Sequence, residues 1–331
     1  MSIRWWLSGV NSPADNGSLT IRPMKAAVCT RYGPPEVLQL QDVADPVPGA
    51  KDVLVRIRAT TVSPSDCYIR SGIPTARLAM RLMARVVIGF TRPRRPILGA
   101  VLAGEVEAIG RKVTRFHVGD RVWAFTMLRM GCYAQRACLP ATLKLLTPAP
   151  SNLGHDEAAA IPYGGLLASY FLGKAKVQSG QQVLVYGASG ANGSCAVQIA
   201  KHLGANVTGV CSTANVDLVR SLGADTVLDY TKEPAAALGR YDVVFDAVGR
   251  RKTSPLKVAS RNALTPTGRF ISVDDVLPRV RRDDLIRLRE LAEAGKLKPV
   301  IDRRYPLEEI AEAHRYVEQG HKKGNVVITV D

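Results

Sequence analysis

A glycine-rich turn between an apolar segment and a helical segment carries the clearest chemical signal in the chain. It lies within VLVYGASGANGSCAVQIAKHLG (183–204) and consists of Gly187, Ala188, Ser189, Gly190, Ala191, Asn192 and Gly193. Gly190 lets the backbone approach a pyrophosphate, and Gly193 lets the following helix pack close to the strand. Because the N-terminus of a helix attracts phosphate, the segment predicts a dinucleotide site. The alternative is a glycine turn in a parallel sheet that binds no ligand.

The end of the next strand indicates which dinucleotide would bind. Sites that select NADH place Asp or Glu about 20 residues after the glycine turn, where it binds the ribose 2′-hydroxyl. Here Cys211, Ser212 and Thr213 occupy that region, so no carboxylate repels a 2′-phosphate and two hydroxyls can bind it. We therefore expect NADPH rather than NADH, with Lys232, next but one to Tyr230, as the candidate cation. Ser212 and Thr213 also suit a helix cap, which is their alternative role.

The segments around this turn alternate between strand and helix patterns from about residue 151 onward. Apolar strand patterns at 181–189, 205–211, 226–230, 241–249 and 268–274 are separated by segments with helical spacing. This alternation predicts a doubly wound parallel sheet covered by helices on both faces.

The chain before residue 151 follows a different pattern. Short β-branched or apolar segments at 52–62, 97–110 and 118–125 alternate with turns, which predicts a β-rich, barrel-like domain. Residues 1–23 lack regular patterning, and we interpret them as a loose N-terminal extension.

An arginine-rich stretch interrupts this first part. There are seven arginines and no acidic residue between Cys67 and Gly104, and Arg77, Arg81 and Arg85 share one stripe of a helix. The stripe indicates attraction for anionic substrates or for a membrane surface. A solvated helix face is the alternative.

The composition of the 331 residues excludes several classes of protein. Hydrophobic residues make up 46% and charged residues 22%, which excludes a disordered, collagen-like or coiled-coil chain. No apolar run approaches the ~18 residues of a spanning helix, so we expect no integral membrane contact. The net charge of +16 favours an anionic partner such as a phosphate-bearing cofactor, and without a reader motif we expect no nucleic acid. The six cysteines form no CxxC pair, which indicates reduced thiols and a cytoplasmic protein.

Taken together, these segments resemble the medium-chain dehydrogenase/reductase superfamily, and within it the zinc-free quinone-oxidoreductase-like branch that includes zeta-crystallin. The resemblance covers about residues 24–331 and rests on SPSDCYIRSG (63–72), ILGAVLAGEVEAIG (97–110), the glycine turn, VCSTANVDLVRSLGAD (210–225) and AEAHRYVEQGHKKGNVVITV (311–330). It implies an α/β protein of two domains. Residues 24–150 and 297–331 would form a GroES-like β-rich catalytic domain, and residues 151–296 a Rossmann doubly wound parallel-sheet domain.

The resemblance also implies that the metal of related enzymes is missing. Zinc-bearing members place Cys, then His-Glu, then Cys around the ion, whereas this chain has Ser63, then Ala100-Val101, and about Pro162 in those positions. None of these residues is a usual zinc ligand, so we expect no metal site. Without a Lewis acid, hydride addition to a quinone or an α,β-unsaturated carbonyl compound is favoured over alcohol oxidation.

Three residues are candidate catalytic groups by the same resemblance. Tyr68 takes the place of a pocket tyrosine that could hydrogen-bond to or protonate the acceptor oxygen, and a wall residue is its alternative role. Asp66 matches an acidic position near the cofactor, with a turn cap as the alternative. Ser63 could hydrogen-bond to the nicotinamide ribose or to the substrate.

The resemblance bears on assembly as well. The connection at 273–283 is short, and relatives usually carry there a further strand that pairs two subunits. We therefore expect a monomer or a weak homodimer. The function expected is zinc-independent hydride transfer from NADPH to a small-molecule quinone or α,β-unsaturated carbonyl substrate. The alternative is an NADPH-binding regulatory or structural protein with little turnover.

Overall fold

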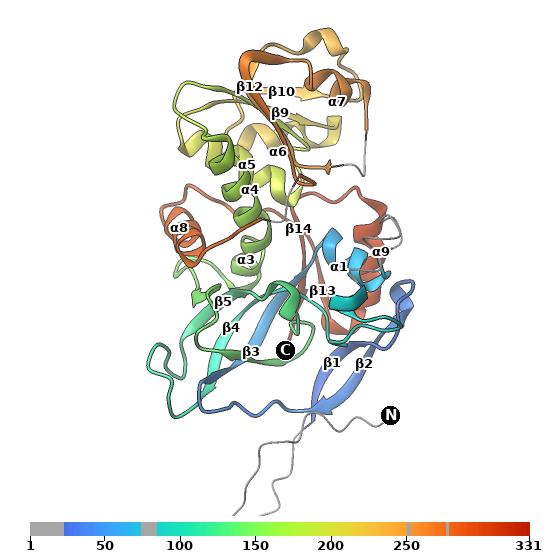
Figure 1. The fold of residues 1–331 in the computed structure, drawn as a ribbon, viewed down its shortest axis with the longest axis vertical. Coiled ribbons are helices and arrows are strands. Elements are labelled where there is room, and N and C mark those ends of the chain that lie inside the picture. Colours follow the sequence, from blue (N-terminus) through green and yellow to red (C-terminus); the bar gives the residue numbers. More distant parts are fainter. Residues whose placement is uncertain (1–22, 74–84, 250–252, 276–277) are drawn as a thin grey trace, which may run out of the picture.

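The computed structural model describes residues 23–73, 85–249, 253–275 and 278–331. The predicted extension therefore lies outside the described residues except for Pro23, which begins the first strand, and so do Arg77 and Arg81 of the arginine stripe. Figure 1 shows two bodies, one built on an antiparallel-rich sheet and the other on a parallel sheet.

The first body contains a seven-stranded sheet. Its strands run in the order β13 (Ile301–Pro306), β14 (Asn325–Thr329), β3 (Asp52–Val62), β4 (Val101–Ile109), β5 (Arg121–Phe125) and β7 (Leu146–Pro148), with β6 (Arg136–Pro140) also paired to β3. β1 (Pro23–Cys29) and β2 (Leu38–Ala44) form a separate antiparallel pair. In β3, Val53, Val55 and Ile57 alternate into the core, as expected for a strand with one buried face.

The C-terminal segment returns to this first sheet. β14 pairs antiparallel with β3 and parallel with β13, so the last strands of the chain complete the sheet that the first part begins. This pairing agrees with the predicted return of residues 297–331 to the β-rich part. The exact domain limits remain predictions.

The second body is the predicted parallel sheet. Its order is β10 (Thr226–Asp229), β9 (Asn206–Cys211), β8 (Gln182–Tyr186), β11 (Tyr241–Asp246) and β12 (Leu264–Ser272), and every pairing is parallel. Val183 and Val185 of β8 pack into one apolar cluster, whereas Leu184 and Tyr186 pack into another on the opposite face. Helices thus cover both faces, which confirms the doubly wound arrangement.

The helices of the described residues are short to medium in length. They are α1 (Pro64–Arg70), α3 (His155–Ala159), α4 (Pro162–Ala175), α5 (Ala191–His202), α6 (Val216–Ser221), α7 (Pro255–Ser260), α8 (Arg282–Glu293) and α9 (Ile310–Gln319). The 3-10 turns that accompany them are η1 (Pro35–Val37), η2 (Met127–Arg129), η3 (Thr213–Asn215), η4 (Ala235–Ala237) and η6 (Leu307–Glu309).

The two bodies share one apolar core. A single buried cluster contains Trp123 of β5, Phe171 of α4 and Phe245 of β11, so the apolar core continues from one body into the other. α4 packs closely against α5 where Gly164 faces the carbonyl oxygen of Ala191. Any side chain at Gly164 would overlap that oxygen, so glycine is what permits this packing.

Candidate active site

A cleft of about 790 Å³ lies between the two bodies. Residues from α1, from the beginning of α4 and from the glycine turn line it, together with residues 317–322. Tyr186, Cys211 and Ala247 place the ends of β8, β9 and β11 on the same wall. The cleft therefore lies at the carboxyl edge of the parallel sheet, where open sheets of this kind bind ligands.

The glycine turn has the geometry of a phosphate cradle. Gly187 has a φ of +81°, a backbone conformation that glycine adopts without strain. A side chain at Gly193 would overlap the carbonyl oxygen of Gly187, so only glycine allows α5 to pack this closely. Ser194 N donates to Gly190 O at 2.8 Å, and the N–H groups before it in α5 have no acceptor within the helix.

Five of the seven predicted turn residues line the cleft: Gly187, Ser189, Gly190, Ala191 and Asn192. The side-chain oxygen of Asn192 is buried without a hydrogen-bond partner, which makes this amide available to a ligand. Ala188 and Gly193 lie behind the wall and shape the turn.

A segment from the other body supports the turn. Gly324 N donates to Ser189 O at 2.7 Å, so the chain just before β14 holds the glycine turn in place.

The predicted 2′-phosphate region is only partly assembled in the cleft. Ser212 and Tyr230 line it, whereas Thr213 and Lys232 do not. The hydroxyl oxygen of Ser212 accepts a hydrogen bond from Asn215 at 3.1 Å, which leaves its proton free to donate.

The hydroxyl of Thr213 is already engaged. It donates to the carboxylate of Asp229 at the end of β10. Burial raises the pKa of Asp229, but the hydrogen bonds from Thr213 and Thr231 outweigh it and hold that pKa below its ordinary value. The sequence pattern did not reveal this carboxylate because Asp229 lies on the neighbouring strand and not at the end of β9.

Ser63 and Asp66 form a helix cap and not part of the cleft wall. The Asp66 carboxylate accepts hydrogen bonds from Ser63 N at 2.8 Å and from Ser63 Oγ at 2.6 Å, and Asp66 N donates to Ser63 Oγ at 3.3 Å. Burial raises the pKa of Asp66 to about 6, although the hydrogen bonds from Ser63 oppose this shift. Both residues thus take the capping role, and the catalytic roles predicted for them lose support because the two side chains satisfy each other.

Tyr68 lies in the cleft wall, as predicted, and two further hydroxyls share that wall. Ser65 Oγ and Tyr163 Oη lie 2.8 Å apart and connect α1 to α4. Ser65 and Tyr68 are three residues apart on one helix face, and that spacing could have identified Ser65 from the sequence. Lys322 also lines the cleft, and burial lowers the pKa of its ammonium group to about 8.

A buried chain of polar groups supports α1 from behind. Cys67 Sγ lies 3.4 Å from His314 Nδ1, and His314 Nε2 lies 3.2 Å from Tyr133 Oη. Burial, and then the charge of Arg70, lowers the pKa of His314 to about 3, so its ring is neutral at physiological pH. The neutral ring can accept from the thiol and donate to the phenol, which joins α1, α9 and the β-rich body.

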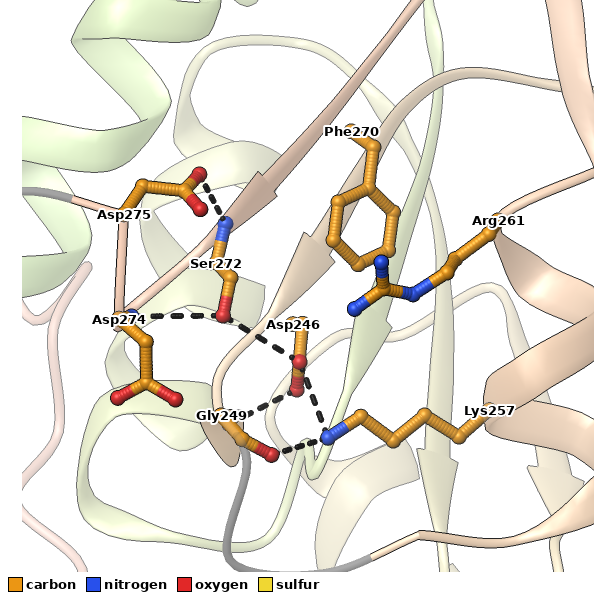
Figure 2. Close-up of a pocket in the computed structure, with 8 residues that line it drawn as sticks. All are labelled: Asp246, Gly249, Lys257, Arg261, Phe270, Ser272, Asp274 and Asp275. Atoms are coloured by element: carbon orange, nitrogen blue, oxygen red, sulfur yellow. Dashed lines mark hydrogen bonds and ion pairs between the residues drawn. The ribbon is translucent and has the colours of Figure 1, made fainter. Parts of the chain in front are cut away.

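A second pocket, of about 220 Å³, lies at the ends of β11 and β12 (Figure 2). Lys257 Nζ lies 3.0 Å from Asp246 Oδ2, and both side chains are buried. Asp246 also accepts from the backbone N–H groups of Val248 at 3.1 Å and Gly249 at 3.0 Å. Since Val248 lines the large cleft, this buried ion pair fixes one part of the cleft wall.

Three family models match the chain. Residues 49–177 match an alcohol dehydrogenase GroES-like domain, and residues 191–274 and 274–328 match zinc-binding dehydrogenase models. An NADPH-dependent alkenal/one oxidoreductase, chloroplastic, from Arabidopsis thaliana is 32% identical over 328 residues, covering 93% of this chain and 80% of that protein. The mitochondrial NAD(P)H oxidoreductase RTN4IP1 from Mus musculus is 30% identical over 361 residues, covering 93% and 89%.

The chain belongs to the medium-chain dehydrogenase/reductase superfamily. Among solved structures, the quinone oxidoreductase from Coxiella burnetii superposes with a TM-score of 0.81 at 28% identity, covering 94% of this chain and all of that one. The α/β fold of this superfamily, a GroES-like domain with a Rossmann-like parallel sheet, is therefore confirmed.

The zinc site of some superfamily members does not fit the residues of this chain. Ser63 is held in the helix cap by Asp66, and Ala100, Val101 and Pro162 carry no side-chain atom that ligates zinc. Within residues 23–73, 85–249, 253–275 and 278–331, no group of three or more His, Cys, Asp or Glu side chains could hold a metal ion.

Proposed function

We propose that this protein is a zinc-independent reductase that transfers hydride from NADPH to an α,β-unsaturated carbonyl compound or a quinone. One observation carries the proposal: the glycine turn and the hydroxyls of Ser65, Tyr68 and Tyr163 face the same cleft. The names of the alkenal/one and quinone oxidoreductase relatives support the same class of substrate.

The chain offers contacts for the phosphate groups of the cofactor. The N-terminus of α5 would bind the pyrophosphate, and the buried Oδ1 of Asn192 would accept a hydrogen bond from a hydroxyl or amide group of the cofactor. The free proton of Ser212 would contact the 2′-phosphate. Lys232 follows β10 outside the cleft lining, so its side chain would have to extend toward this phosphate. Bound NADPH supplies the hydride.

The hydroxyls of the wall would stabilise the acceptor. Hydride addition to the carbon–carbon double bond builds negative charge on the conjugated carbonyl oxygen, and a positioned donor lowers the energy of that state. Tyr68 Oη is the candidate donor. The Ser65–Tyr163 pair would position the substrate or pass a proton along its hydrogen bond.

The cysteines and the relatives bear on the cellular location. All six cysteines are free thiols, which fits a reducing compartment and the cytoplasmic location predicted from the sequence. The chloroplastic and mitochondrial relatives indicate that this fold also serves inside organelles.

Cofactor oxidation tests the proposal directly. The full chain is mixed with NADPH or NADH and a panel of enones, alkenals and quinones, with and without exhaustive chelation. We expect NADPH oxidation with at least one substrate class, slower oxidation of NADH, and no effect of the chelator. Tight NADPH binding without turnover on the whole panel would instead support the regulatory or structural role. If the purified protein contains stoichiometric zinc and chelation removes the zinc and the activity together, zinc independence is contradicted.

A further inference from the structure

An exposed apolar surface lies beside the cleft and takes no part in it. Val86, Val87 and Phe90 are 53%, 57% and 59% exposed, and Met127 and Leu128 of η2 are 43% and 58% exposed. These five account for most of the nine large apolar side chains that are exposed among the described residues. We call residues 86–95 and η2 the apolar–basic surface.

Arginines accompany these apolar side chains. Arg92, Arg94, Arg95 and Arg129 are exposed, and there is no acidic residue from 67 to 104 or from 121 to 155. Arg129 of η2 lies near Arg95, at the end of the 86–95 segment, and its charge adds to partial burial in lowering the pKa of Arg95. The hydrogen bond from Gly131 N to Ile97 O, at 3.0 Å, joins the same two segments.

The structure holds the segment in a defined position. The Arg85 guanidinium lies 4.1 Å from the ring centre of Tyr32, and Tyr32 Oη donates to Gly89 O at 2.8 Å. Arg94 N donates to Ile88 O at 2.7 Å, which closes the segment into a turn. Arg85 Nη2 also donates to Gly72 O at 3.2 Å, next to Ser71 in the cleft wall. The apolar–basic surface is thus an ordered neighbour of the cleft.

We propose that the apolar–basic surface docks this protein on an anionic lipid membrane. Exposed valine and phenylalanine side chains among arginines match the two parts of a membrane surface, the acyl boundary and the lipid phosphates. Arginine forms bidentate hydrogen bonds with phosphate, and no carboxylate of these stretches opposes the attraction. The contact is peripheral, since no helix in the described part of the chain has the length and apolarity to cross a bilayer.

Docking on a membrane would place the cleft of the proposed reductase at a lipid surface. Quinones and long-chain unsaturated carbonyl compounds dissolve in lipid, so a cleft held at a membrane surface meets them at high local concentration. Nucleic acid offers phosphates without an apolar layer, and an acidic protein surface offers no phosphates. Both therefore match the surface less well than an anionic membrane.

Vesicle sedimentation tests the proposal with the full chain. Vesicles of phosphatidylcholine alone are compared with equimolar phosphatidylcholine and phosphatidylglycerol, at low and high salt. The apolar test variant is Val87→Asp with Phe90→Asp, and the charge test variant is Arg92→Gln with Arg94→Gln. The controls are single substitutions of the same kinds elsewhere on the protein: Val258→Asp, which replaces a valine that is 60% exposed on α7, and Arg220→Gln on α6.

We expect binding to the anionic vesicles only, weakened by salt. Each test variant should lose binding by roughly tenfold, whereas the controls should bind like the original chain. NADPH oxidation with a water-soluble quinone reports the fold and the proposed activity separately from membrane binding. Equal binding to neutral vesicles, binding that either test variant retains, or displacement from anionic vesicles by a small excess of duplex RNA would overturn the proposal.

Discussion

Ser65 and Tyr68 lie three residues apart on α1, so both hydroxyls leave the helix on the face that lines the cleft. Ser63 and Asp66 lie on the same short segment, yet they turn toward each other and close the helix cap. The type of a residue does not separate these two roles, because Ser and Asp serve equally well in a cap and in a binding site. Because α1 begins at Pro64, Ser63 and Asp66 fall at the positions that form a cap, whereas Ser65 and Tyr68 do not.

Replacing Tyr68 with Phe tests the donor role. We expect turnover on enones to fall by about 10²–10³, as at other sites that lose one oxyanion donor. The loss should be smaller with quinones, which delocalise the charge themselves. Steady-state turnover is the measurement, and NADPH affinity by fluorescence should not change. Tyr170→Phe, on α4 and outside the cleft wall, is the matched control. If turnover is unchanged on every active substrate, Tyr68 only lines the cleft and does not act as a hydrogen-bond donor to the substrate.

The buried Asp66 carboxyl should make stability depend on pH. Burial raises its pKa from 3.8 to about 6, so the folded chain binds this proton more tightly than the unfolded chain does. Its contribution to the free energy of unfolding is therefore fully present below about pH 4 and is lost as the pH rises through about 6. The change amounts to roughly 3 kcal/mol at most.

Urea unfolding of the original chain and of Asp66→Asn, at several pH values from 4 to 7, measures this effect. As the pH rises, the unfolding free energy of the original chain should fall relative to that of Asp66→Asn. Asp217→Asn, at a fully exposed side chain, is the control for the substitution itself. If the unfolding free energies of Asp66→Asn and the original chain change with pH in parallel, the raised pKa of Asp66 is contradicted.

At the scale of the elements, the strand–turn–helix unit was predictable because its causes are local. β8, the glycine turn and α5 follow from consecutive residues, and so does the β-branched pattern of β3. α4 was not predictable in the same way. Glycine disfavours a helix interior, yet α4 runs through both Gly164 and Gly165. Gly164 allows α5 to pack against α4, because a side chain there would overlap α5. The residues of α4 alone do not indicate that α5 lies at this position.

The two helices provide a matched pair of glycine substitutions. A side chain at Gly193 would overlap the Gly187 carbonyl, so Gly193→Ala should destabilise the protein by about 1–3 kcal/mol and weaken NADPH binding. Gly173 on α4 is exposed, and no atom lies within 4 Å of the position that an added methyl group would take. Gly173→Ala should therefore stabilise the helix by roughly 0.5–1 kcal/mol and leave binding unchanged. Thermal unfolding and fluorescence titration check both. Equal effects of the two substitutions would contradict the packing argument.

At the scale of the whole molecule, the parallel sheet ends at β12. Among the described residues no further strand follows β12 on that edge. The strand contains exposed Pro266 and Arg269, and proline and charge both hinder pairing with another edge. The 273–283 connection was predictable as short from the sequence alone. What covers the edge in solution was not, because it depends on other molecules.

We expect the protein to be a monomer or a weak dimer in solution. β12 is a poor edge for pairing, and the net charge of +16 adds repulsion between copies. Light scattering coupled to size-exclusion chromatography, at micromolar concentration and moderate salt, gives the mass. A stable dimer mass that persists on dilution would contradict this expectation. Substituting Arg269 with Val should then strengthen the dimer only if β12 forms the interface.

β14 has a consequence for how the protein is made. This strand lies between β13 and β3, inside the first sheet, although it follows the whole parallel sheet in the chain. Residues 59–62 of β3, which pair with β14, emerge early and stay unpaired on that side until the ribosome has produced the entire second body, whereas β6 can already cover residues 52–56. The parallel sheet can close first, and the GroES-like domain is the last to mature. The nascent chain therefore passes through a stage in which residues 59–62 of β3 are open to other proteins, and a chaperone would find its target there.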